Sequence, residues 1–205
     1  MLRTLQVLAL MLPVVVLADV DPRFAKLRDS ADALSSLGGF LDKYGGDCGS
    51  IIEGGAECGK NAEAFRKAAN GHKFYMILTE DSTSVLSMGT FNPQGGEVQF
   101  NLTPFFPGSN SAVTHGAPSK TDAAGNPVLP FITFKGNLPD GWNIQMMARQ
   151  VSARQMRLQV VFSPQGVWEL PKKGGGKIHG VKAHIDAILV TVGRTGEQVA
   201  LWINK

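Results

Sequence analysis

Residues 181–203 constrain the fold more than any other stretch, because they carry the clearest β-hairpin pattern in the chain. Apolar and polar side chains alternate at its start, where the predicted buried face consists of Val181, Ala183, Ile185 and Ala187. This period of two predicts a half-buried strand. Apolar residues then follow one another from 188 to 190, so we expect the strand to continue into a region covered on both faces. A turn at 193–196 and alternating apolar residues after it predict a returning antiparallel strand.

Further strands are predicted upstream of this hairpin. Alternating or apolar runs bounded by turn residues occur at 74–78, 85–91, 98–102, 128–135 and 167–170. The stretch 142–157 fits either a helix or a strand, whereas Leu158, Val160 and Phe162 alternate as a strand. The chain has 24 glycines in 205 residues, more than the usual ~7%, which favours turns and β-structure. We therefore expect a mainly antiparallel β-sandwich or partly open barrel.

The region before these strands has a helical pattern. Asp21 and Pro22 form a typical helix start, and one amphipathic helix is predicted from Phe24, Leu27, Ala31, Leu34, Gly38 and Leu41. A second, shorter helix is predicted at 62–69. These patterns predict a small helical N-terminal unit at 19–71, followed by an antiparallel β domain at 72–205.

The first 18 residues have the features of a secretory signal peptide. A short basic start with Arg3 precedes an apolar run at 5–17, and small residues precede a cleavage point after Ala18. The alternative is a membrane anchor, but a run of thirteen residues is shorter than the ~20 needed to cross a bilayer. We expect the mature chain to be secreted or periplasmic, with no integral membrane segment.

Two cysteines, Cys48 and Cys58, lie ten positions apart in a glycine-rich segment. In an exported chain such a pair predicts a disulfide, which would stabilise the short loop by about 2 to 3 kcal/mol. The other interpretations are a redox pair, which more often has the spacing C-x-x-C, and a metal site, which would need further ligands nearby.

The charge of the chain is nearly balanced. The formal net charge of +3 falls to +2 if Arg3 is removed with the signal peptide. Binding to nucleic acid would call for a clustered basic face, so we expect no nucleic-acid partner.

His184 and Asp186 are the most chemically suggestive pair. Because they are two residues apart on a predicted strand, we expect their side chains on one face, about 7 Å apart. They could act as two metal ligands or as a base with its orienting group. The alternative is a solvated face shared with Lys182. The chain contains no G-x-S-x-G, H-E-x-x-H or C-x-x-C signature, and we expect no cofactor, metal or catalytic residue.

Two loops are the predicted ligand-binding segments, because binding residues concentrate on loops held by a rigid frame. The loop at 108–127 follows the aromatic pair Phe105 and Phe106. The loop at 171–179 is basic and glycine-rich, and its lysines are Lys172, Lys173 and Lys177. If the two loops are adjacent, aromatic and cationic groups together suit an anionic amphiphile. The sequence leaves that adjacency open.

These features predict an exported, non-enzymatic binding or accessory protein. Its expected partner is a small molecule, a lipid or an envelope protein. The competing hypothesis is a secreted hydrolase or metal-dependent enzyme that uses His184 and Asp186.

Overall fold

A computed structural model of the chain describes residues 20–46, 55–78, 86–103, 111–118, 122, 123, 128, 130–171 and 175–204. The predicted signal peptide lies outside these residues, as do Cys48 and the side chain of Cys58. Among the described residues, four helices and nine strands form a mostly β structure with one large mixed sheet. The predicted β-rich fold is thus confirmed, whereas the sheet is not closed into a barrel and a sandwich is not confirmed.

The sheet has eight strands in one path and a ninth beside it. The path runs through β1 (Asp32–Ala33), β2 (Phe74–Leu78), β7 (Met156–Pro171), β8 (Lys177–Val192), β9 (Gln198–Ile203), β6 (Ile132–Asn137), β4 (Glu97–Leu102) and β3 (Leu86–Asn92). The ninth strand, β5 (Ser111–His115), pairs with β8. Most neighbours are antiparallel, as predicted, but β1 with β2 and β5 with β8 are parallel.

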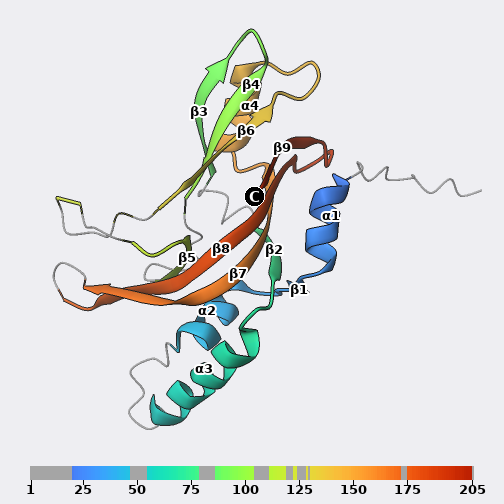
Figure 1. Cartoon of the computed structure of the whole chain (residues 1–205). Coiled ribbons are helices and arrows are strands. Elements are labelled where there is room, and N and C mark those ends of the chain that lie inside the picture. Colours follow the sequence, from blue (N-terminus) through green and yellow to red (C-terminus); the bar gives the residue numbers. More distant parts are fainter. Residues whose placement is uncertain are drawn as a thin grey trace, which may run out of the picture.

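Strand β8 is the place where the sheet divides. One edge of β8 pairs with β7 along its whole length. The other edge pairs with β5 at 179–183 and with β9 at 187–191. In Figure 1, β3, β4, β6 and α4 (Ile144–Ser152) rise above β8, while β5 lies below them. We call the gap at residues 184–186, between β5 and β9, the fork.

A β-bulge at Asp186 changes which face of β8 each side chain occupies. Val161 pairs with Ala187 and Phe162 pairs with Ile185, so Asp186 is an extra residue on β8. A bulge breaks the strict alternation of side chains. Ile185 therefore belongs to the main core and Ala187 to a second core on the opposite face. The prediction that Ala187 shares the face of Val181, Ala183 and Ile185 is wrong for this reason.

The main core lies between the sheet and helices α2 (Leu37–Gly45), α3 (Gly55–Ala69) and α4. Phe40 of α2 anchors it, with its ring centroid 5.1 Å from that of Phe74 and 5.5 Å from that of Phe162. Met147 of α4 is fully buried in the same core. Helix α3 confirms the second helix predicted at 62–69, but it begins earlier, at Gly55.

Helix α1 (Pro22–Asp29) covers the opposite face of the sheet. Asp21 caps it by accepting the Arg23 backbone N–H at 2.8 Å, and Phe24 is fully buried against Val161 and Leu189. The prediction of a single helix through Leu41 is wrong. Between α1 and α2 the chain forms β1, where the Asp32 N–H donates to the Lys73 carbonyl and the Leu34 N–H donates to the Tyr75 carbonyl. Helices α1 and α2 contribute to different cores.

Two other segments differ from the prediction. The loop predicted at 108–127 contains β5, which sequence could not signal because parallel pairing needs no adjacent turn. The strand predicted at 167–170 is the end of the continuous 16-residue β7. The ambiguous stretch 142–157 contains helix α4 and then the start of β7, so the strand predicted for the second half of 142–162 is confirmed.

A side chain at position 180 is expected to destabilise the protein, because Trp168 packs directly on Gly180. A methyl group at position 180 would lie 2.4 Å from Trp168 Cζ2 and 2.4 Å from the Ala112 carbonyl oxygen. Gly180→Ala should therefore lower the free energy of unfolding in urea by about 1 to 3 kcal/mol. Gly59→Ala is the matched control, because it lies exposed in α3 with nothing within 4 Å. It should be stabilising by about 0.5 to 1 kcal/mol, and equal effects of the two changes would contradict this packing.

Candidate functional site

Asp186 is held by residues from outside its own strand. Its side chain is 10% exposed and forms an ion pair with Lys73, which precedes β2. Its other carboxylate oxygen accepts a hydrogen bond from Ser163 of β7 at 2.8 Å. A buried carboxylate must be paired in this way to offset its lost hydration. Asp186 therefore ties together three neighbouring segments of the sheet.

His184 contacts different partners from those of Asp186. Its Nε2 lies 3.2 Å from Asn204 Nδ2, which follows β9, and its ring centroid lies 6.1 Å from that of His115 at the end of β5. The structure thus joins His184 to His115 and Asn204, and joins Asp186 to Lys73 and Ser163. It does not place Asp186 as the hydrogen-bonded orienting group of His184.

Two polar side chains close the fork. The backbone N–H of Ile185 donates to His115 Nδ1 at 3.4 Å, and Asn204 Nδ2 donates to the Ile185 carbonyl at 3.1 Å. The backbone N–H of Asn204 also donates to the Asp186 carbonyl at 2.9 Å. Side chains thereby make the hydrogen bonds that neither β5 nor β9 makes at this part of β8. Sequence reasoning missed this role of His115, because nothing local to that residue connects it to β8.

His115 is expected to be neutral in the folded protein. Burial lowers its pKa below the usual value, and the charge of His184 lowers it further. A neutral imidazole can accept the Ile185 N–H at Nδ1, whereas a protonated ring has donors only. The fork is therefore matched to unprotonated His115.

Stability should fall when His115 becomes protonated. Its pKa is lower in the folded protein than in the unfolded chain, so the unfolded chain takes up the proton first as the pH falls through about 6.5. We expect the free energy of unfolding to decrease from about pH 7.5 to about pH 5.5 and His115→Gln to reduce this dependence. Urea unfolding at both pH values measures it, and the same decrease in both proteins would show that His115 is not responsible.

The residues predicted from the two loops are mostly outside the described part of the chain. Phe105, Phe106, Lys172 and Lys173 belong to that group. Lys177 begins β8 and forms an ion pair with Glu169 Oε1 at 2.6 Å, with both side chains more than half exposed. Because Glu169 compensates its charge, Lys177 contributes little net positive charge to an anion site.

An open cleft of about 280 Å³ lies next to this ion pair. It is lined by Gly45, Gly46, Val167, Trp168, Glu169, His179 and Gly180. The end of α2 forms one wall and the β7–β8 hairpin forms the other, which puts the predicted 171–179 segment at its border. Val167 is half exposed there.

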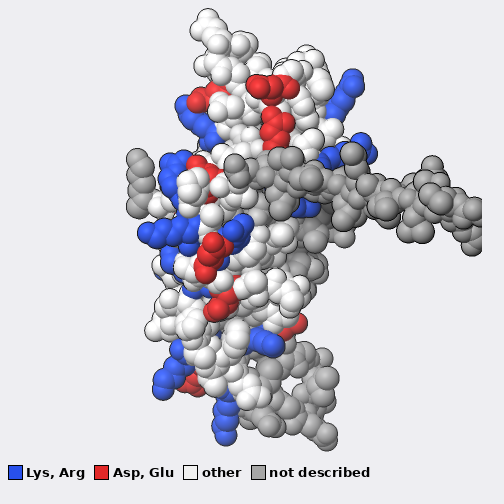
Figure 2. Space-filling view, turned by 90° about the vertical axis from the view of Figure 1, so that its right-hand side faces the viewer, with Lys and Arg blue, Asp and Glu red and all other residues white. Residues whose placement is uncertain are grey.

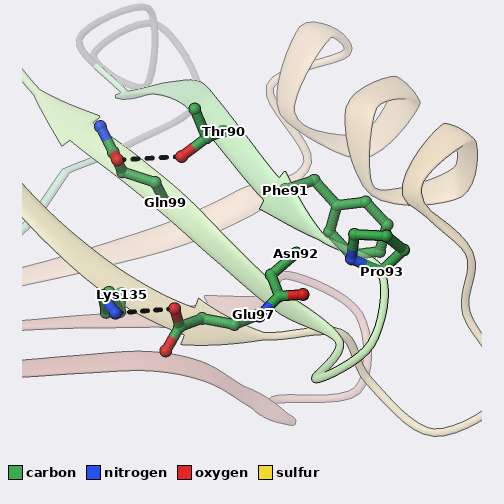
Figure 3. A pocket seen from close by; sticks show the side chains of 7 residues that line it. All are labelled: Thr90, Phe91, Asn92, Pro93, Glu97, Gln99 and Lys135. Carbon is green, nitrogen blue, oxygen red and sulfur yellow. Dashed lines mark hydrogen bonds and ion pairs between the residues drawn. The ribbon is translucent and has the colours of Figure 1, made fainter.

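A larger open hollow of about 530 Å³ lies on the hairpin formed by β3 and β4 (Figure 3). This β3–β4 hollow is lined by Thr90, Phe91, Asn92, Pro93, Glu97, Gln99 and Lys135. Figure 3 shows two polar contacts in it: Thr90 Oγ1 donates to Gln99 Oε1 at 3.1 Å, and Lys135 pairs with Glu97 Oε1 at 2.8 Å. Phe91 and Pro93 contribute apolar rings to the lining of the same hollow.

A β-bulge in β3 positions Gln99 in this hollow. The register of β3 and β4 shifts between Met88 and Phe91, which leaves Gly89 and Thr90 opposite Gln99. A methyl group at position 89 would lie only 2.9 Å from Gln99 Nε2. The absence of a side chain at Gly89 therefore lets the Gln99 amide lie across β3 and reach Thr90.

The polar contacts continue from β4 to β6. Gln99 Nε2 donates to Asn101 Oδ1 at 3.4 Å, and Thr133 Oγ1 donates to the same oxygen at 2.9 Å. We call Thr90, Gln99, Asn101 and Thr133 the amide row. The alternation of polar residues in 97–101 and 133–137 is the sequence signal that corresponds to it, but that signal alone indicates only an exposed face.

Charges of both signs are interspersed on the face shown in Figure 2.

Within the described part of the chain, no group of three or more His, Cys, Asp or Glu residues is placed to hold a metal ion. No described helix is both long and apolar enough to cross a membrane.

A family model described as a family of unknown function, DUF6066, matches residues 1–205. The chain belongs to the DUF6066 family. Searches of curated proteins and of solved structures gave no match. In this DUF6066 member, the hollow, the cleft and the fork are the features from which we infer function.

Proposed function

We propose that the chain is an exported, non-enzymatic binding or accessory protein whose ligand surface is the β3–β4 hollow with its amide row. The observation that carries the proposal is the hydrogen bonding within the row, which holds the Gln99 and Asn101 amides of β4 between Thr90 of β3 and Thr133 of β6. Polar groups held in place before a ligand arrives lose less entropy on binding. The export part of the proposal rests on the sequence pattern of residues 1–18.

The contacts of Asp186 weigh against the competing hypothesis of a hydrolase or metal-dependent enzyme. A carboxylate that orients a catalytic histidine has to bond to that histidine. Asp186 instead bonds to Lys73 and Ser163, while His184 contacts Asn204. These contacts support a structural role for Asp186.

The proposal has two forms, which differ in the ligand: an anionic amphiphile or a polar molecule. An anionic amphiphile would use the basic segment near the α2 cleft, where Lys177 is already paired with Glu169. A ligand of the amide row would be polar, because the row offers amide and hydroxyl groups. The second form has the support of the described geometry.

Binding should depend on Gln99 and be independent of His184. We expect calorimetry with the mature chain to detect binding to neutral oligosaccharides, anionic oligosaccharides or anionic lipid vesicles. Gln99→Ala should weaken this binding at least about tenfold, because it removes the centre of the amide row. Gln198→Ala is the matched control, an exposed glutamine on β9, and should bind like wild type.

Three outcomes would overturn the proposal. One is that none of these ligands binds. A second is that Gln99→Ala binds as well as wild type. The third is turnover of a ligand that is lost in His184→Ala. N-terminal sequencing of protein recovered outside the cytoplasm checks the export part, because cleavage after Ala18 leaves Asp19 as the first residue.

A further inference from the structure

We propose that the exposed face of β4 and β6 binds a neutral carbohydrate chain, with the ring of Phe131 as a stacking platform and the amide row as the hydrogen-bonding surface. This inference rests on the proposed function and specifies the ligand class of the same surface.

Phe131 lies on the same face of the sheet as the amide row. From Phe131, the residue immediately before β6, to Asn137, exposed and buried residues alternate without interruption, so Phe131 continues the exposed face that carries Thr133 and Lys135. Phe131 is 62% exposed, more than the other large hydrophobic side chains of the described chain. An aromatic ring in that position loses contact with water when a ligand covers it, which favours binding.

The surface is long and its groups are in register. Thr133 pairs with Asn101 and Lys135 pairs with Gln99 across β4 and β6. Phe131 precedes Thr133 by two residues, about 7 Å along the strand, and the distance from Phe131 to Asn137 is about 20 Å. A row of that length fits a chain of several sugar rings better than a single small molecule.

The chemistry of the row matches sugar hydroxyl groups. Each hydroxyl of a sugar both donates and accepts hydrogen bonds, and amide and hydroxyl side chains offer both functions. The C–H faces of a sugar ring are apolar and can cover an aromatic ring such as Phe131. One aromatic ring next to a row of amide and hydroxyl groups therefore provides both kinds of contact that a carbohydrate needs.

The charge of the surface favours a neutral ligand. Lys135 and Glu97 are the charged groups that line the hollow, and they pair with each other at 2.8 Å. An anionic ligand would have to compete with Glu97 for Lys135 and would meet the Glu97 carboxylate. A lipid surface would require a basic or broadly apolar patch, whereas this face presents one exposed aromatic ring among polar groups.

The test is calorimetric titration of the mature chain with defined oligosaccharides of four to six units. Neutral probes are oligomers of glucose, mannose and N-acetylglucosamine, and an oligogalacturonate is the anionic probe. We expect at least one neutral series to bind more tightly than the anionic probe. Phe131→Ala should weaken that binding at least about tenfold, because it removes the platform.

Two variants make the test specific. Phe131→Trp keeps an aromatic platform, so it should retain binding and its fluorescence should change when the sugar is added. Ile77→Ala is the control, because it removes an exposed hydrophobic side chain from β2, at a distant part of the sheet path. It should bind like wild type.

The inference is wrong if no neutral oligosaccharide binds, or if Phe131→Ala binds as tightly as wild type. It is also wrong if the oligogalacturonate or anionic vesicles bind and the neutral probes do not. In that last case Gln99-dependent binding would still support the proposed function, so the two proposals can fail separately.

Discussion

The backbone of Ile185 has to be hydrogen-bonded within the protein, because this residue is only 1% exposed and none of the described strands pairs with its outer edge. His115 and Asn204 meet that requirement from the ends of β5 and β9. An unpaired buried backbone group costs about 1 to 3 kcal/mol, so these two side chains are part of the sheet itself. The division of the sheet at β8 depends on them.

The bulge at Asp186 has consequences for both faces of the sheet. It sends Ile185 to the main core and Ala187 to the core beneath α1. Each helix of the pair α1 and α2 then has its own apolar surface to cover, and β1 carries the chain between them. Beyond the point where the sheet divides at β8, the strands β6, β4 and β3 extend the sheet past β9. One face of β4 and β6 is buried, and their exposed face carries the amide row.

Sequence predicted the elements whose signals are local. Alternation revealed β2, β4 and the β8–β9 hairpin, and Asp21 with Pro22 marked the start of α1. Contacts between distant segments carried no local signal, so β5, the Asp186 bulge and the break between α1 and α2 were missed. The site prediction had the same limit: His184 and Asp186 are near each other in sequence, but their partners come from positions 73, 115, 163 and 204. Likewise, a polar alternation in β4 and β6 cannot show that Gly89 leaves room for Gln99.

Hydrogen exchange at the Ile185 amide tests the central claim most directly. If His115 accepts this N–H inside the fork, the Ile185 amide should exchange as slowly as the amides of β8 that pair with β9, and His115→Ala should accelerate it selectively. The neighbouring β8–β9 pairs serve as internal reference, because global destabilisation would accelerate them as well. An Ile185 amide that exchanges at the rate of exposed loops in the wild-type protein would contradict the account of the fork.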